Sequence, residues 1–221
     1  MDHSVNNLLT IEKEIQLKIS QNISLQKLPK IVAVSKTFPM SSILPLINHG
    51  HLNFGENKVQ EAIEKWESIK RDFSHLKLHM IGKLQKNKVK QAISLFDYIH
   101  SLDSLKLAEK ISNEQIKQNK KIKIFIQVNI GKEDQKGGIL SSELESFSKK
   151  CVEDFGLNII GLMCLPPNDN NISLYFSEMK NMINKIDSKE LSMGMSNDYL
   201  EAIKFESTYL RIGSKIFGSR N

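Results

Sequence analysis

The sequence predicts an α/β protein in which eight short parallel strands close into a single barrel of the TIM type. Short apolar segments of strand length alternate along the chain with longer segments whose apolar residues recur at helical spacing. The alternation repeats eight times, and 221 residues are enough for one such barrel. No linker or second compositional region divides the chain, so residues 1–221 are expected to form one domain. An open doubly wound sheet is the alternative, although no glycine-rich dinucleotide-binding motif follows the first strand.

The first 50 residues predict a helix, a strand and a second helix. Apolar residues recur at helical spacing over 5–21, which is typical of an amphipathic helix. Four consecutive apolar residues at 31–34 lead into Lys36 and predict a strand that is buried on both faces. Pro39 begins another helical pattern, which Gly50 ends.

The same unit then repeats to the end of the chain. Glycine or proline follows several of the short apolar runs, and the segment 131–138 is a turn-rich loop. The remaining strands are predicted at 52–54, 77–81, 97–101, 121–130, 157–163, 191–192 and 208–212, and the helices between them at 59–71, 87–95, 104–118, 141–153, 171–187 and 197–204.

Composition and charge exclude several classes of partner. The net charge of +6 comes from 31 Lys and Arg against 25 Asp and Glu, and the lysines are scattered, so no nucleic-acid partner is expected. No apolar run approaches the roughly 20 residues that span a bilayer, and no secretory signal is visible, so no membrane partner is expected. Cys151 and Cys164 form no Cys-x-x-Cys motif, which predicts neither a disulfide nor a metal site and fits a cytoplasmic protein.

The residues that follow the strands of such a barrel share one mouth. Lys36, after the first strand, is the candidate nucleophile there, although an exposed lysine that merely ends a strand is the other interpretation. Glu56 stands alone among the carboxylates at the strand ends. The sequence therefore predicts no pair of carboxylates that would act as acid and base.

Two loops at the same mouth suit a phosphate group. Gly213 and Ser214 precede a short helix, whose first N–H groups and dipole favour an anion. Ser196 is placed as the N-cap of the helix at 197–204 and could offer its hydroxyl. These loops follow the seventh and eighth strands, the usual phosphate site of these barrels. The other interpretation is that Ser196 only caps a helix and Gly213 only ends a strand.

An amine facing a phosphate site suits pyridoxal 5'-phosphate (PLP), which also needs a partner for its ring nitrogen. Arg211 is placed to be that partner, unless it forms a salt bridge at the barrel rim. Because an arginine does not give up its proton, it would leave the ring nitrogen unprotonated and weaken the ring as an electron sink.

The chain resembles the YggS/PROSC family of PLP homeostasis proteins in six segments between residues 31 and 218, in the family's order. The segments are specific as a set rather than singly. They are AVSKT at 33–37; FGEN at 54–57 with VQE at 59–61; HMIG at 79–82 with LQ at 84–85 and NK at 87–88; GLM at 161–163; LSMGMS at 191–196; and RIG at 211–213 with IFG at 216–218.

The resemblance implies a barrel like the amino-terminal domain of alanine racemase, the fold type III class of PLP proteins. Lys36 would carry PLP as an internal aldimine, and Arg211 would lie near the pyridine nitrogen. Glu206 departs from a glycine that is common in the family and would alter the approach to the last strand. The other matched positions are Ser196, Gly213 and Ser214 for the phosphate, where Ser214 replaces a common threonine, and Asn57, His79 and Met80 along the pocket.

The resemblance also implies a function. It predicts a monomeric PLP carrier that buffers the cofactor and can deliver it to PLP-dependent apo-enzymes, without strong catalysis. The alternative is a PLP-dependent amino-acid racemase or lyase of low activity, in which His79 or Tyr98 serves as an extra base. The other interpretation of these two residues is that each packs in or near the barrel wall.

Overall fold

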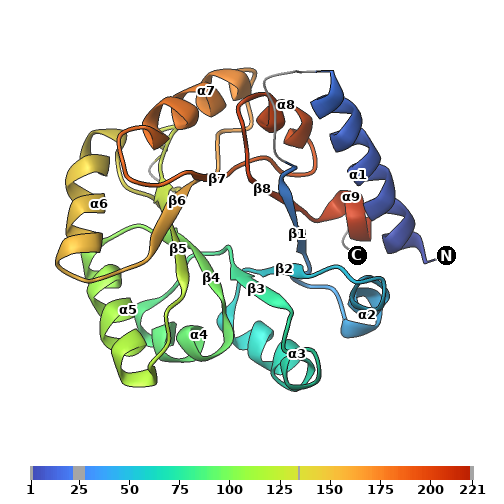
Figure 1. Cartoon of the computed structure of the whole chain (residues 1–221), viewed down its shortest axis with the longest axis horizontal. Helices are drawn as coiled ribbons and strands as arrows, with labels where there is room; N and C mark the ends of the chain where they lie inside the picture. The colour runs from blue at the N-terminus through green and yellow to red at the C-terminus, as the bar shows by residue number, and fades with distance from the viewer. Residues whose placement is uncertain (1, 22–27, 134, 220–221) are drawn as a thin grey trace.

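Eight parallel strands form a closed barrel in a computed structural model of the protein, which describes residues 2–21, 28–133 and 135–219. The strands pair in chain order, β1 pairs with β8 to close the sheet, and the helices surround it (Figure 1). The predicted barrel is confirmed, and the open doubly wound alternative is wrong. The strands are β1 (Lys30–Val34), β2 (Asn53–Glu56), β3 (Lys77–Met80), β4 (Tyr98–Leu102), β5 (Lys123–Val128), β6 (Ile159–Cys164), β7 (Glu190–Ser192) and β8 (Tyr209–Ile212).

The helices follow the predicted order, with small differences at their ends. The helices predicted at 87–95 and 141–153 each begin with a 3-10 turn. The strand predicted at 121–130 ends earlier, because the Asn129 side chain donates to the Glu133 and Lys136 carbonyls and holds the next loop. The helices are α1 (His3–Ser20), α2 (Met40–Asn48), α3 (Val59–Asp72), α4 (Val89–Leu95), α5 (Leu105–Gln118), α6 (Leu144–Glu153), α7 (Ile172–Ile183), α8 (Tyr199–Lys204) and α9 (Ser214–Phe217), with the 3-10 turns η1 (Lys86–Lys88) and η2 (Ser141–Glu143).

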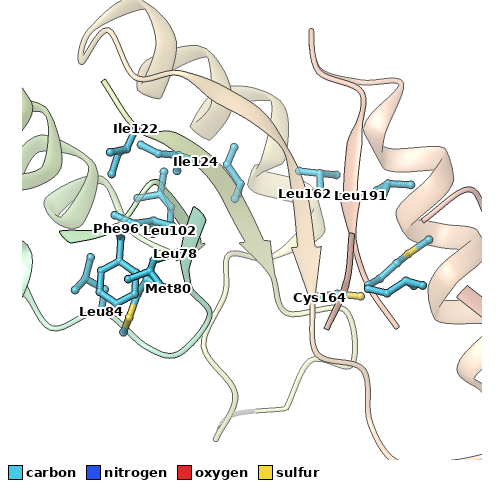
Figure 2. Close-up of a cluster of buried hydrophobic side chains, with 14 of the residues drawn as sticks. Leu78, Met80, Leu84, Phe96, Leu102, Ile122, Ile124, Leu162, Cys164 and Leu191 are labelled. Atoms are coloured by element: carbon cyan, nitrogen blue, oxygen red, sulfur yellow. The ribbon is translucent and has the colours of Figure 1, made fainter. Parts of the chain in front are cut away.

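Side chains along the strands alternate between two buried layers. The larger layer lies between the sheet and the helices, and Figure 2 shows part of it, including Leu78, Met80 and Phe96. The smaller layer fills the inside of the barrel with Val32, Tyr98, Phe125, Met163 and Tyr209.

Two backbone positions bear on the assembly of the last three strands. At Gly161, an added Cβ would lie 1.8 Å from the carbonyl oxygen of Glu190, so only glycine lets β6 approach β7 this closely. Glu206 has a φ of 61°, in the left-handed region that favours glycine. Glu206 is therefore an unfavourable residue in the turn before β8, at a position where the resemblance implied a glycine.

The opening helix packs against the last two helices, α8 and α9 (Figure 1). Asn7 Nδ2 donates a hydrogen bond of 3.0 Å to the carbonyl of Ile216. The Tyr199 hydroxyl donates to the Glu14 carboxylate, and Lys215 Nζ lies 3.6 Å from the same carboxylate. These contacts support α8 and α9 behind the loops that follow β7 and β8.

Within the described ranges, no helix combines the length and the apolar character needed to cross a bilayer. The same residues include no group of three or more His, Cys, Asp or Glu side chains arranged to hold a metal ion.

Candidate functional site

A cavity of about 750 Å³ lies at the carboxyl ends of the strands. Residues at or just after the carboxyl ends of β1, β2, β3, β6, β7 and β8 line it, so six of the eight strands contribute to its wall. Six of the eight residues predicted for the site line this cavity: Lys36, Asn57, Ser196, Arg211, Gly213 and Ser214.

The residues on either side of Lys36 are fixed by hydrogen bonds. The Ser35 amide donates to the carbonyl of Gly55 at 3.0 Å, and the Ser35 hydroxyl donates to Glu56 Oε1 at 2.8 Å. The Thr37 amide donates to Glu61 Oε1 at 2.6 Å. Thr37 has a φ of 69°, a strained conformation for a β-branched residue, and this hydrogen bond helps to hold it. The Lys36 side chain therefore projects from a backbone segment that is hydrogen-bonded to β2 and α3.

Lys65 contacts both carboxylates that hold this turn. Its Nζ donates to the Ser35 carbonyl at 3.0 Å and forms ion pairs with Glu56 at 3.0 Å and Glu61 at 2.9 Å. Glu56 is fully buried, and its Oε1 also accepts from Trp66 Nε1 at 3.0 Å. The lone carboxylate expected at the mouth therefore supports the turn that carries Lys36. Partial burial raises the pKa of Glu61, but the hydrogen bonds from Thr37 and Lys65 outweigh it and hold that pKa below its ordinary value.

The loops after β7 and β8 meet at Ser196. The prediction that Ser196 caps the helix at 197–204 is wrong, because that helix begins at Tyr199 and follows Asp198. The Ser196 hydroxyl instead accepts from the amides of Gly213 at 3.3 Å and Lys215 at 3.4 Å, at the start of α9. The short helix expected after Gly213 is present, and Ser196 lies at its amino end.

Arg211 is almost fully buried, with 3% of its surface exposed, yet it reaches the cavity wall. Its Nη1 donates to Ser192 Oγ at 2.6 Å, and its Nη2 donates to the Cys164 carbonyl at 2.8 Å. The predicted salt-bridge alternative is thus replaced by hydrogen bonds to neutral groups. Burial lowers the pKa of Arg211, but a guanidinium remains protonated near neutral pH. Burial also raises the pKa of the Cys164 thiol to about 12, and both Cys164 and Cys151 are free.

Asn57 and Gly82, from the loops after β2 and β3, form another part of the cavity wall. A Cβ at Gly82 would lie 2.3 Å from the Asn57 carbonyl oxygen, so only glycine allows the loops after β2 and β3 to meet. Asn57 Oδ1 is buried and has no hydrogen-bond partner among the described residues. This acceptor on the cavity wall is suited to a donor group on a bound molecule.

The structure does not bring His79 and Met80 to the cavity. Both lie on β3 itself rather than after it, so their side chains point into the two buried layers below the mouth. His79 is fully buried inside the barrel, stacked on Tyr98 with ring centroids 4.1 Å apart, and Met80 packs between the sheet and the helices (Figure 2). Their segment reaches the cavity through Ile81 and Gly82 instead, and a contact of His79 or Met80 with the cofactor stays a prediction.

One wall of the cavity was not predicted from the sequence. It is formed by the segment between β6 and α7, including Pro166, Pro167, Asn168 and Asp169. The two prolines indicated the end of a strand, and their position after β6 was the signal that they face the common mouth. Met195, Asn197 and Asp198 beside Ser196 complete this side.

Comparisons with known proteins show the fold and the family of this chain. Residues 16–221 match the family described as alanine racemase, N-terminal domain. The pyridoxal phosphate homeostasis protein of Haemophilus influenzae is 34% identical over 226 residues, which cover 98% of this chain and 95% of that protein. PipY of Synechococcus elongatus PCC7942, solved with PLP bound, is 30% identical with a TM-score of 0.78, covering 92% of this chain and 100% of that one. Alanine racemase of Clostridium difficile 630, at 16% identity and a TM-score of 0.73, covers 100% of this chain and 57% of that one and shows the shared fold alone.

These matches first define the class, a barrel of the alanine racemase amino-terminal type. Within that class, the chain belongs to the family of pyridoxal phosphate homeostasis proteins. The resemblance to the YggS/PROSC family that the sequence segments indicate is thereby confirmed.

Proposed function

We propose that this protein binds PLP in the barrel-mouth cavity, attaches it reversibly through Lys36 and takes part in PLP homeostasis. The observation that carries the proposal is that Lys36, Ser196 and Arg211 line one cavity although they come from three different strand ends. PipY, a relative of known structure, has been solved with PLP bound. The Haemophilus influenzae relative is named a pyridoxal phosphate homeostasis protein.

The chemistry of the cavity fits the parts of this cofactor. The Lys36 amine would attach the aldehyde, and the start of α9 with Ser196 and Ser214 offers donors for the phosphate. Arg211 would face the ring nitrogen. Asn57 Oδ1, which has no partner among the described residues, would accept a hydrogen bond from a donor group of the cofactor. Bound PLP supplies an electron sink, and a guanidinium that only donates weakens that sink.

The positions of the candidate bases favour a carrier over an enzyme. A racemase or lyase would need an extra base within hydrogen-bond reach of the substrate. His79 and Tyr98, the two candidates, are buried inside the barrel and are absent from the cavity lining. The acidic side chains that do line the cavity are Asp169 and Asp198, which were not among the predicted bases.

Delivery to apo-enzymes, a monomeric state and a cytoplasmic location complete the proposal. The monomeric state rests on the resemblance to the family, and two free cysteines support a reducing compartment. Transfer to an apo-enzyme is tested by mixing the PLP-loaded protein with an apo-enzyme that depends on PLP. The delivery part fails if activity returns no faster than with the same amount of free PLP.

The binding proposal is tested by titrating the protein with PLP and following its visible absorption. We expect a new band in the wild type that Lys36→Ala abolishes. Lys149→Ala is the matched control, because Lys149 is an exposed lysine on α6, away from the cavity. A band that survives in Lys36→Ala, or no band in the wild type, would overturn the proposal.

A further inference from the structure

A continuous chain of hydrogen bonds crosses the inside of the barrel and ends at the cavity. Starting from the cavity, Arg211 Nη1 lies 2.6 Å from Ser192 Oγ, and Ser192 Oγ lies 2.8 Å from His100 Nδ1. His100 Nε2 then lies 2.9 Å from His79 Nδ1, and His79 Nε2 lies 3.1 Å from Asn53 Oδ1. The five residues come from β8, β7, β4, β3 and β2, so the chain spans the barrel from the mouth to the opposite end.

Only one direction of donation along this series of hydrogen bonds gives every donor an acceptor. A guanidinium can only donate, so Ser192 Oγ accepts from Arg211 and has its own hydrogen for His100 Nδ1. His100 must then carry its proton on Nε2 and donate it to His79 Nδ1. His79 in turn carries its proton on Nε2 and donates to the Asn53 side-chain oxygen. Both imidazoles are neutral in this arrangement.

Donation in the opposite direction leaves the Ser192 hydroxyl without an acceptor. If His100 donated from Nδ1, Ser192 Oγ would accept from both His100 and Arg211. The Ser192 hydrogen would then need another acceptor. Among the described residues, His100 and Arg211 are the hydrogen-bond partners of that hydroxyl, so no further acceptor is available. An unsatisfied hydroxyl at a fully buried serine is unfavourable.

The surroundings keep both rings neutral and fixed. Tyr98 stacks on His79 with centroids 4.1 Å apart, and Phe125 stacks on His100 at 4.3 Å. Burial lowers the pKa of His79 well below its ordinary value, and the cations that face it, Lys30, Lys70 and Lys123 with the nearby His51, act in the same direction. Burial lowers the pKa of His100 likewise, reinforced by His79 and Arg211.

We propose that Ser192 and His100 are positioning residues that hold the Arg211 guanidinium in a fixed orientation at the cavity wall. His79 and Asn53 fix the tautomer of His100, and the oriented Ser192 lone pair then aligns the Arg211 Nη1–H bond. The inference rests on the proposed function only where Arg211 meets PLP. The direction of the hydrogen-bond chain is a property of the protein without PLP.

The first test therefore uses the protein without PLP. Nitrogen-15 NMR of its histidine side chains distinguishes the two neutral tautomers from the cation, and His79→Gln and His100→Gln identify the signals. We expect both rings to be neutral with the proton on Nε2 at pH 7. A proton on Nδ1 of His100, or a cationic ring at either position, overturns the proposed direction whether or not the protein binds PLP.

The second test compares variants of two buried serines in the barrel. Ser192→Ala removes the contact to Arg211, while Ser192→Thr keeps the hydroxyl. Ser101→Ala is the matched control, because Ser101 is equally buried and its hydroxyl has no hydrogen-bond partner among the described residues. All three are titrated with PLP, and the visible band of the bound cofactor is recorded against pH.

We expect Ser192→Ala to weaken PLP binding about tenfold, the usual effect of losing a hydrogen bond to a charged group. It should also shift the pH at which the band changes, which a purely structural serine would not do. Ser192→Thr should restore both properties, and Ser101→Ala should match the wild type. Wild-type affinity and an unchanged pH profile in Ser192→Ala would overturn the proposal. If the wild type itself binds no PLP, the proposed function fails while the NMR test still decides the direction of the chain.

Discussion

The position of Lys36 depends on hydrogen bonds made by the residues on either side of it. Ser35 is tied to Gly55 and Glu56, and Thr37 is tied to Glu61. The chain reverses direction at Thr37 through a left-handed conformation that a β-branched residue rarely adopts. The Lys36 side chain therefore projects from a strained turn that α3 holds in place.

Replacing the residue that holds this turn should loosen Lys36. Glu61→Gln removes the charge that pairs with Lys65 and weakens the hydrogen bond from Thr37. We expect PLP binding, measured by titration of the visible band, to weaken about fivefold to tenfold. Glu64→Gln on the same helix is the control, because Glu64 is exposed and contacts only Gln60 in the hydrogen bonds described. Equal affinities for the two variants would contradict this role of Glu61.

At the scale of elements, the loops after β2 and β3 meet where Gly82 touches the backbone of Asn57. In Gly82→Ala, the new Cβ would lie 2.3 Å from the Asn57 carbonyl oxygen, and a backbone atom cannot move aside easily. We expect the free energy of unfolding to fall by about 2 kcal/mol or more and PLP binding to weaken. Chemical denaturation measures the first effect.

Gly50→Ala is the control for this substitution. Gly50 has a φ of +96°, and an added Cβ would meet nothing within 4 Å. The substitution therefore tests backbone strain without a collision, and we expect a loss of about 1 kcal/mol with unchanged PLP affinity. A Gly82→Ala protein no less stable than Gly50→Ala would show that the loops are not packed as described.

The hydrogen bond between α1 and α9 is expected to contribute to stability. Asn7→Ala removes the hydrogen bond to the Ile216 carbonyl, and we expect the free energy of unfolding to fall by about 1 kcal/mol. Gln16→Ala, at an exposed position of the same helix, should have little effect in the same denaturation experiment. A similar loss in both variants would indicate a general effect on α1.

The elements were predictable because each strand and helix carries a local pattern. The run at 31–34 predicts β1 without any knowledge of its neighbours, since both faces of that strand are buried. Ser196 shows the limit of such patterns. Its sequence position suggests a helix cap, but its partners, Gly213 and Lys215, belong to a distant loop. The surroundings of His79 show the same limit, because Tyr98 and His100, which pack against it, lie on a different strand.

At the scale of the whole molecule, the buried histidines link stability to pH. The folded-state pKa values of His79 and His100 lie well below their ordinary value, mainly because of burial, and that of His51 is lowered to about 4 for the same reason. In the unfolded chain these rings take up protons near pH 6.5, while the folded protein does not. Their contribution to stability is therefore complete above about pH 6.5 and is lost as the pH falls.

We accordingly expect the free energy of unfolding to decrease as the pH is lowered from 7 to 5. Urea denaturation at a series of pH values measures this slope, and His51→Gln should make it shallower. A free energy of unfolding that is constant or rises over this range would contradict the neutral, buried state of these histidines.

Chemical trapping of the cofactor on the protein shows directly whether Lys36 is the point of attachment. The wild type is mixed with PLP, reduced with borohydride, digested and examined by mass spectrometry. We predict that the mass of the reduced cofactor is found on the peptide that contains Lys36. Attachment to other lysines with Lys36 unmodified would contradict the account of the cavity given above.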